Sequence, residues 1–146
     1  MRLTESELTG DLLRELHALN NSCFPKELQP PFGEFEYQAT RGNVFILRTP
    51  TLEQLVGLAI VTDREGGHHL WTLAVGEIYR GWGFAKKLLN EIHAAFPEIT
   101  LNTQVDNVAA QVLYLKNGYR VEKVSRWYYP NNVDGVFMRR KNYGQD

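Results

Sequence analysis

The feature that most constrains this sequence is a glycine-rich turn that joins a strand-like run to a helix-like run. The first run is Leu70–Val75, the turn carries Arg80, Gly81 and Gly83, and the helical spacing of apolar residues extends over 82–96. Such a turn directs unpaired backbone N–H groups, together with the positive end of a helix dipole, at one point. The segment therefore predicts an anion site, and phosphate is the natural ligand.

The alternative interpretation is a strand-to-helix turn in which glycine serves only the backbone geometry. A P-loop ending and a GxGxxG motif are both absent, so the turn matches neither of the two common nucleotide loops. Without a Cβ atom at Gly81 and Gly83, a ligand could approach the backbone closely. Arg80 and either Lys86 or Lys87 would supply mobile positive charge.

A second motif begins about two dozen residues downstream of the turn. Asn107 opens a short helical segment, Tyr114 follows seven residues later, and Gly118-Tyr119 ends the segment. A pair of motifs in this order is much more specific than a single glycine motif.

Together the two motifs resemble the GNAT superfamily of acyl-CoA-dependent N-acetyltransferases. The pyrophosphate loop of that family reads Gln/Arg-x-x-Gly-x-Gly/Ala, which Arg80, Gly83 and Ala85 match. The resemblance is strong over 68–141 and thin before it. It implies an α/β (α+β) fold with a curved, mostly antiparallel mixed sheet, opened between its fourth and fifth strands, and helices on both faces.

The resemblance also implies acetyl-CoA as co-substrate and no metal. A strand edge would bind the pantetheine arm by augmentation, and the glycine turn would bind the pyrophosphate. The cofactor-binding residues that it implies are Leu73, Ala74, Val75, Arg80, Gly81, Trp82, Gly83, Phe84, Ala85, Lys86, Asn107, Ala110 and Tyr114.

For catalysis, the resemblance places Tyr114 as the general acid for the leaving thiolate. A phenol is protonated at neutral pH, although packing of an amphipathic helix would also explain the residue. His69 is the candidate base, with simple solvation at a strand start as the alternative. Ribosomal-protein N-terminal acetyltransferases have a Glu where this chain has Asn102, which cannot take a proton.

The acceptor site is expected between two aromatic walls. Tyr128 and Tyr129 resemble the Tyr-Tyr-Pro stretch of those N-terminal acetyltransferases and form one wall with Trp127. Phe24, Phe32 and Phe35 supply the other wall. Neither wall carries a run of acidic residues, which a polycationic amine would require. These features favour the N-terminus of a peptide or protein as acceptor. Small amines, including antibiotics and polyamines, are the alternative, as is a non-catalytic acyl-CoA-binding sensor.

The composition fits one N-acetyltransferase domain over residues 1–146. Hydrophobic residues make up 43% and charged residues 23%, and the net charge of -1 disfavours a nucleic-acid partner. No apolar run has the length of a membrane span, and the N-terminal segment lacks the core of a signal peptide. Cys23 is the single cysteine, which fits packing and a reducing, cytoplasmic location. Whether the chain is a monomer or a homodimer is left open.

Thr9 or Asp11 is expected to cap an N-terminal helix that Pro25 ends, and a short helix should pass through Phe35 and Tyr37. A strand is compatible with the segment before Thr9. Further predicted strands are 43–48, 54–62, 68–75, 99–105, 119–129 and 133–141, and further predicted helices are 82–96 and the segment between Asn107 and Gly118. The apolar run 55–61 suits a strand buried on both faces. Because helix 82–96 joins two strands of one sheet, those strands should be parallel. The end of the chain, Gly144–Asp146, is expected to fray.

Overall fold

In the computed structural model, which describes residues 1–141, six strands form one mixed sheet in the order β1-β2-β3-β4-β6-β5. The strands are β1 (Asn43–Arg48), β2 (Leu55–Arg64), β3 (Gly67–Val75), β4 (Ile99–Gln104), β5 (Tyr119–Ser125) and β6 (Gly135–Arg140). The helices are α1 (Gly10–Ser22), α2 (Phe32–Arg41), α3 (Phe84–Ala95) and α4 (Val108–Lys116). Neighbouring strands are antiparallel except β3 and β4, which are parallel as predicted. The expected frayed end, Gly144–Asp146, lies outside the described residues.

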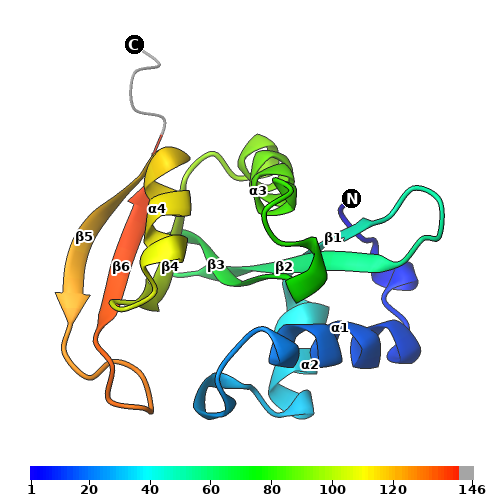
Figure 1. Ribbon diagram of the computed structural model, residues 1–146, viewed down its shortest axis with the longest axis horizontal. Helices are drawn as coiled ribbons and strands as arrows, with labels where there is room; N and C mark the ends of the chain where they lie inside the picture. The colour runs from blue at the N-terminus through cyan, green and yellow to red at the C-terminus, as the bar shows by residue number, and fades with distance from the viewer. Residues whose placement is uncertain (142–146) are drawn as a thin grey trace.

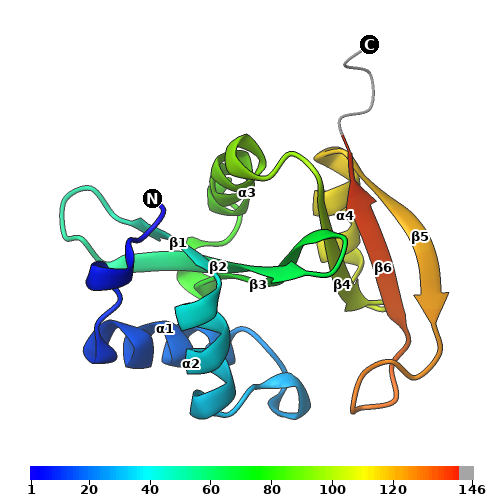
Figure 2. The ribbon, with the colours of Figure 1, turned by 180° about the vertical axis from the view of Figure 1, so that it is seen from behind.

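The central strand β2 is buried on both faces, which confirms the prediction from its apolar run. Ala59 and Val61 belong to a core cluster on the α3 side, whereas Leu58 and Ile60 belong to a second cluster on the side of α1 and α2. Alternate residues of a strand point to opposite faces, so one continuous apolar run serves both clusters. Figures 1 and 2 show α1 and α2 on one side of the sheet and α3 on the other. The prediction of helices on both faces is confirmed.

Helix α1 shows how the sequence sets the bounds of one covering element. The Thr9 hydroxyl accepts a hydrogen bond from the Leu12 N–H at 3.2 Å, which makes Thr9 the N-cap. Leu13, Leu16 and Asn20 form the buried face. The helix ends at Ser22, before Pro25 as expected. The last buried position, Asn20, is polar, and this exception is relevant to the site.

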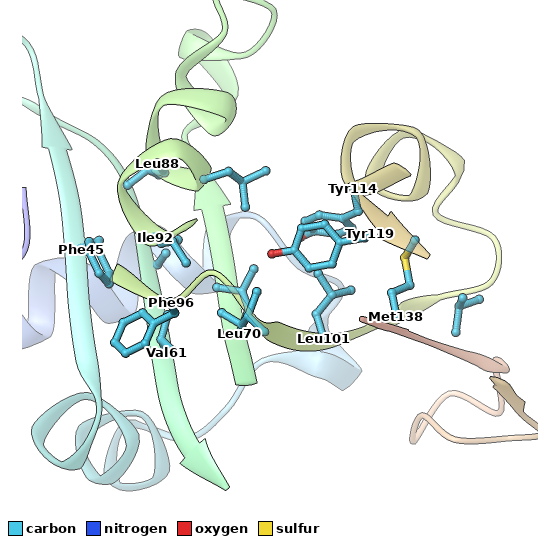
Figure 3. Packing of buried hydrophobic residues seen from close by; sticks show 14 residues of the cluster. Phe45, Val61, Leu70, Leu88, Ile92, Phe96, Leu101, Tyr114, Tyr119 and Met138 are labelled. Carbon is cyan, nitrogen blue, oxygen red and sulfur yellow. The ribbon is translucent and has the colours of Figure 1, made fainter. Parts of the chain in front are cut away.

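The cluster on the α3 side continues into the second half of the sheet. Figure 3 shows it extending from Leu88 and Ile92 of α3 to Tyr114 of α4 and Tyr119 of β5. The rings of Tyr114 and Tyr119 are in edge-to-face contact, with centroids 5.4 Å apart. This contact holds α4 against β5 of the sheet.

The sheet opens between β3 and β4. These strands pair through His69 with Thr100 and Leu70 with Leu101. Directly after Leu70 the register with β2 shifts, so that Val61 pairs with Leu70 but Ile60 pairs with Thr72. Figures 1 and 2 show β4, β6 and β5 turned steeply against the other three strands. Since Arg2 forms an isolated bridge with Phe45 in place of a first strand, β3 and β4 are the fourth and fifth strands of the prediction, and the predicted opening is confirmed.

Two strand predictions were too long. The strands predicted over 119–129 and 133–141 are β5, which ends at Ser125, and β6, which begins at Gly135. Trp127 and Asn132 have φ values of 51° and 62°, which a strand does not allow. The Asp134 carboxylate accepts a hydrogen bond from the Trp127 N–H at 2.8 Å and holds 126–134 as a loop. None of the helices within residues 1–141 has the length and apolar character that a bilayer crossing requires.

Candidate active site

A cavity of about 540 Å³ occupies the opening between β3 and β4. Three parts of the chain surround it: the facing strands with α4, the proline-rich segment after α1, and the loop between β5 and β6. The lining residues are Asn20, Cys23, Phe24, Pro25, Glu27, Leu28, Gln29, Pro30, Pro31, Glu34, Leu70, Trp71, Thr72, Leu73, Leu101, Asn102, Thr103, Gln104, Asn107, Ala110, Tyr114, Tyr129 and Pro130. Its position at a split in the sheet gives a ligand access to strand backbone as well as to side chains.

The edge of β3 that faces the split lies past its last pairing with β4. Leu73 lines the cavity, whereas the side chain of Ala74 is buried in the cluster of α1 and α2. Ala74 pairs with Leu58 of β2, so neither its side chain nor its backbone is directed to the cavity. The Val75 carbonyl accepts hydrogen bonds from Arg80 Nε at 3.1 Å and from the Cys23 thiol at 3.4 Å. Cys23 is thus a packing residue that ties α1 to the end of β3.

The glycine turn follows β3 beyond the cavity lining. Gly81 and Gly83 have φ values of +83° and +82°, and a Cβ atom at either position would meet no protein atom within 4 Å. Gly83 is the N-cap of α3, and no side chain among residues 1–141 caps this helix. The backbone N–H groups of the first turn therefore have no side-chain cap, which leaves them available as an anion site requires.

The side chains of the turn differ in their freedom. Arg80 is held against the Val75 carbonyl, so it stabilises the start of the turn. Trp82 is 75% exposed, and Lys86 is exposed on the first turn of α3. Phe84 makes an edge contact with Tyr79, with centroids 6.2 Å apart, and Ala85 follows it on the helix. Of the side chains expected to supply mobile positive charge, Lys86 and Lys87 are exposed, whereas Arg80 is held by its hydrogen bond.

Tyr114 of α4 lines the cavity and also belongs to the core cluster on the α3 side. Its side chain is 9% exposed, and burial raises its pKa above the ordinary value for a phenol. Asn107 caps α4 by accepting a hydrogen bond from the Ala110 N–H at 3.1 Å, and both residues line the cavity beside Tyr114. The cavity therefore presents a hydroxyl group that stays protonated at neutral pH.

His69 lies at the junction of β3 and β4 and does not line the cavity. Its side chain is buried, and Nδ1 lies 2.7 Å from the Thr100 hydroxyl oxygen. Burial, with a smaller contribution from Arg64, lowers the pKa of His69 to about 4. The structure thus does not bring the predicted base together with Tyr114.

Among the predicted acceptor residues, Phe24 and Tyr129 line the cavity, from two different segments of the chain. Tyr128 is 48% exposed and does not line the cavity. Its ring is in edge contact with that of Tyr129, with centroids 4.9 Å apart. Phe32 packs against the cluster of α1 and α2, with its ring 5.4 Å from that of His17. Phe35 was expected near this wall but is fully buried in that cluster, because it lies on the inner face of α2.

Sequence reasoning missed the polar residues of the acceptor side. Glu27 and Glu34 line the cavity, although neither belongs to an acidic run. Asn20 and Thr72 are buried beside it, and the Thr72 hydroxyl donates to Asn20 Oδ1 at 2.6 Å. A polar residue at a buried position of α1 was the available signal for Asn20. Within residues 1–141, no three His, Cys, Asp or Glu side chains converge as metal ligands would.

Comparisons with known proteins agree with this architecture. The sequence is 29% identical over 132 residues to an uncharacterized protein of Mycobacterium leprae, which covers 84% of this chain and 36% of that protein. It is 31% identical over 94 residues to an uncharacterized N-acetyltransferase of Methanocaldococcus jannaschii, covering 60% of each. The chain thus spans less than two thirds of the length of either relative.

Among solved structures, the ribosomal-protein-S18-alanine N-acetyltransferase from Escherichia coli superposes with a TM-score of 0.81 at 19% identity, over 100% of this chain and 97% of that chain. At this identity the likeness shows the shared fold. The sequence model of the acetyltransferase (GNAT) family matches residues 13–119, which is more than half of the chain. This chain therefore belongs to the acetyltransferase (GNAT) family.

Proposed function

We propose that residues 1–146 form one N-acetyltransferase domain that moves the acetyl group of acetyl-CoA to a primary amine by direct attack in a ternary complex. The observation that carries the proposal is the position of Tyr114. Its phenol lies in a cavity that has a strand edge on one side and an aromatic-lined segment on the other. Tyr114 can thus meet a thioester bound along the strand edge and an amine that enters from the acceptor side.

Acetyl-CoA would supply an activated acetyl group as a thioester and a thiol as leaving group. For its pantetheine arm, the edge of β3 offers the backbone of Leu73 and the N–H of Val75, whose carbonyl is already bound by Arg80 and Cys23. Asn107 and Ala110 flank the same path from α4. The pyrophosphate fits the open backbone of Gly81–Lys86, where the side chains of Lys86 and Lys87 add positive charge.

In the reaction that we propose, the amine nitrogen forms a bond to the acetyl carbon as the carbon–sulfur bond breaks. Tyr114 donates its hydroxyl proton to the departing sulfur, and solvent restores that proton. The acceptor nitrogen gives two protons to water, one from the ammonium group before the attack and one as the amide forms, because His69 does not line the cavity. Direct proton removal by His69 stays a prediction that mutagenesis can test.

The acceptor that we propose is the N-terminus of a peptide or protein. Phe24 and Tyr129 both line the cavity of about 540 Å³, one from the segment after α1 and the other from the loop between β5 and β6. The E. coli structural neighbour is named for acetylation of an alanine of a ribosomal protein. An α-amino group has an ordinary pKa of about 7.7 to 8.0, against about 10.4 for lysine, so water suffices to deprotonate it.

A small amine is the second candidate acceptor, and Glu27 with Glu34 in the cavity lining is the observation that favours it. A panel experiment separates the two candidates. The protein is mixed with acetyl-CoA and with peptides that have free or blocked N-termini, with polyamines or with aminoglycosides. Thiol release and mass spectrometry report the reaction.

We expect acetylation of free N-termini and none of blocked ones. Modification of the small amines alone would replace the peptide proposal. Failure of every acceptor, with acetyl-CoA still bound, would identify a non-catalytic acyl-CoA-binding module.

A further inference from the structure

The cavity has a one-sided distribution of charge on its acceptor half. Glu27 and Glu34 both line it, and no Lys, Arg or His does so among the described residues. Within residues 1–141 neither carboxylate forms an ion pair. Both negative charges are therefore available to a ligand.

The cofactor half has the opposite charge. The turn after β3 and the first turn of α3 carry Arg80, Lys86 and Lys87, against Glu77 as the one acidic side chain of that segment. The whole chain is close to neutral, with a net charge of -1. The local field at each end therefore comes from nearby side chains, and the charges that line the acceptor half attract cations. Lys26, next to Glu27, is exposed but does not line the cavity.

Both carboxylates come from the same wall. Glu27 lies in the short 3-10 turn after Pro25, and Glu34 lies in the first turn of α2. The opposite wall contributes Tyr129 and Pro130, which are uncharged. One reacting ammonium group can occupy only one place, so two carboxylates leave negative charge for a second cation.

We infer that Glu27 and Glu34 determine specificity by selecting acceptors that carry a second positive charge close to the reacting amine. For a peptide this means Lys or Arg directly after the first residue, and it disfavours Asp or Glu there. The inference rests on the proposed function and names the acceptor class of the same cavity. Exposed charge pairs are individually weak, so two of them give a preference of about three- to ten-fold at low ionic strength.

The test compares kcat/KM for three peptides that differ only at the second residue, which is Lys, Gln or Asp. We expect the order Lys, Gln, Asp in wild type, and a smaller spread at high salt. In the double variant Glu27→Gln with Glu34→Gln, the three values should converge. Glu36→Gln is the matched control, because Glu36 is exposed on α2 and does not line the cavity. It should leave the order and the spread unchanged.

A second pair of acceptors separates this inference from the choice of a peptide acceptor. 1,5-Diaminopentane and 5-aminopentanol have equal length and differ by one positive charge. If peptides are not acetylated, the same preference should appear between these two amines. Equal use of the charged and uncharged partners, or an equal effect of Glu36→Gln, would overturn the inference. Acetylation of neither peptides nor amines would reject both proposals.

Discussion

Two tyrosines that touch each other differ in what surrounds their hydroxyl groups. The Tyr119 hydroxyl lies 2.8 Å from His93 Nε2, within the hydrogen-bond range, and its side chain is fully enclosed. Tyr114 contacts the Tyr119 ring but also lines the cavity. The pKa of each phenol is raised, chiefly by burial. Of these two tyrosines, only Tyr114 combines a proton held at neutral pH with a place in the cavity lining.

Replacement of Tyr114 with Phe keeps the ring and removes the acid. Turnover should fall by roughly 10²- to 10⁴-fold, while acetyl-CoA affinity changes little. Steady-state kinetics and calorimetric titration measure the two quantities. Tyr119→Phe is the matched control, since it removes a neighbouring hydroxyl outside the cavity. It should lower stability by about 1 kcal/mol and leave turnover intact. Full activity of Tyr114→Phe would reduce Tyr114 to a packing residue.

For single residues, the sequence predicted the positions that depend on local spacing along the chain. Asn107 caps α4 as its position before a helix predicts, and Tyr114 follows from the spacing of the motif. The directions of side chains could not be predicted where the backbone departs from a regular pattern. The register shift in β3 follows Leu70, so counting alternate residues back from Leu73 does not tell which face of the sheet His69 meets.

Among the elements, the turn between β3 and α3 is the one whose backbone is expected to bind the ligand. Its two glycines adopt left-handed conformations, which other residues rarely adopt, and they face open space. Two explanations exist for such glycines: backbone geometry alone, or room for a ligand. Gly66, which has the same conformation but lies in another turn, provides a control that separates the two explanations.

Gly83→Ala should weaken acetyl-CoA binding much more than Gly66→Ala does. Gly66 has a φ of +88°, against +82° at Gly83, and a Cβ atom would meet no protein atom within 4 Å at either position. Each substitution therefore costs a similar backbone strain, of about 1 kcal/mol. Gly66 lies in the turn between β2 and β3, at the opposite end of β3 from Gly83. Isothermal titration with acetyl-CoA and thermal unfolding of both variants make the comparison. Equal affinities would show that the turn does not hold the pyrophosphate.

The elements themselves were predictable where the apolar periodicity is strong. The strand over 43–48 was predicted with the observed bounds, and the run 55–61 correctly predicted a strand buried on both faces. The loop 126–134 was not predictable, because Trp127, Tyr128 and Tyr129 have a high strand propensity. Its shape depends on the hydrogen bond from the Trp127 N–H to Asp134, a contact that composition does not reveal.

Over the whole molecule, two half-sheets meet at the short pairing of β3 with β4, and a buried histidine lies in that junction. The pKa of His69 is about 4 in the folded chain, below its ordinary value of about 6.5. His93, on α3, has its pKa lowered to about 4 by burial and by Arg140. Both imidazoles are therefore neutral in the fold above this range, whereas the unfolded chain protonates them below about pH 6.5.

The free energy of unfolding should consequently be full above about pH 6.5 and fall as the pH is lowered toward 4. Each histidine contributes at most about 1.4 kcal/mol per pH unit in that window. Urea denaturation at pH 7, 6 and 5 measures the slope, and His69→Gln should make it shallower. The variant should keep its turnover at pH 8, because the side chain does not reach the cavity. An unchanged slope would contradict the burial of a neutral His69, and loss of turnover would restore it as the base.

The split sheet also has a consequence for how the chain behaves among other proteins. Past Leu70 the inner edge of β3 leaves its parallel partner, so the molecule has an unpaired strand edge inside its own sheet. Unpaired edges are where foreign strands add and where aggregation starts, and proteins usually protect them with charges, prolines or bulges. In this chain two such protective features lie at the unpaired edge. They are the register shift after Leu70 and the prolines Pro30 and Pro31, which line the cavity. A bound ligand along this edge would act as a surrogate strand and would keep the protein from associating with unfolded chains.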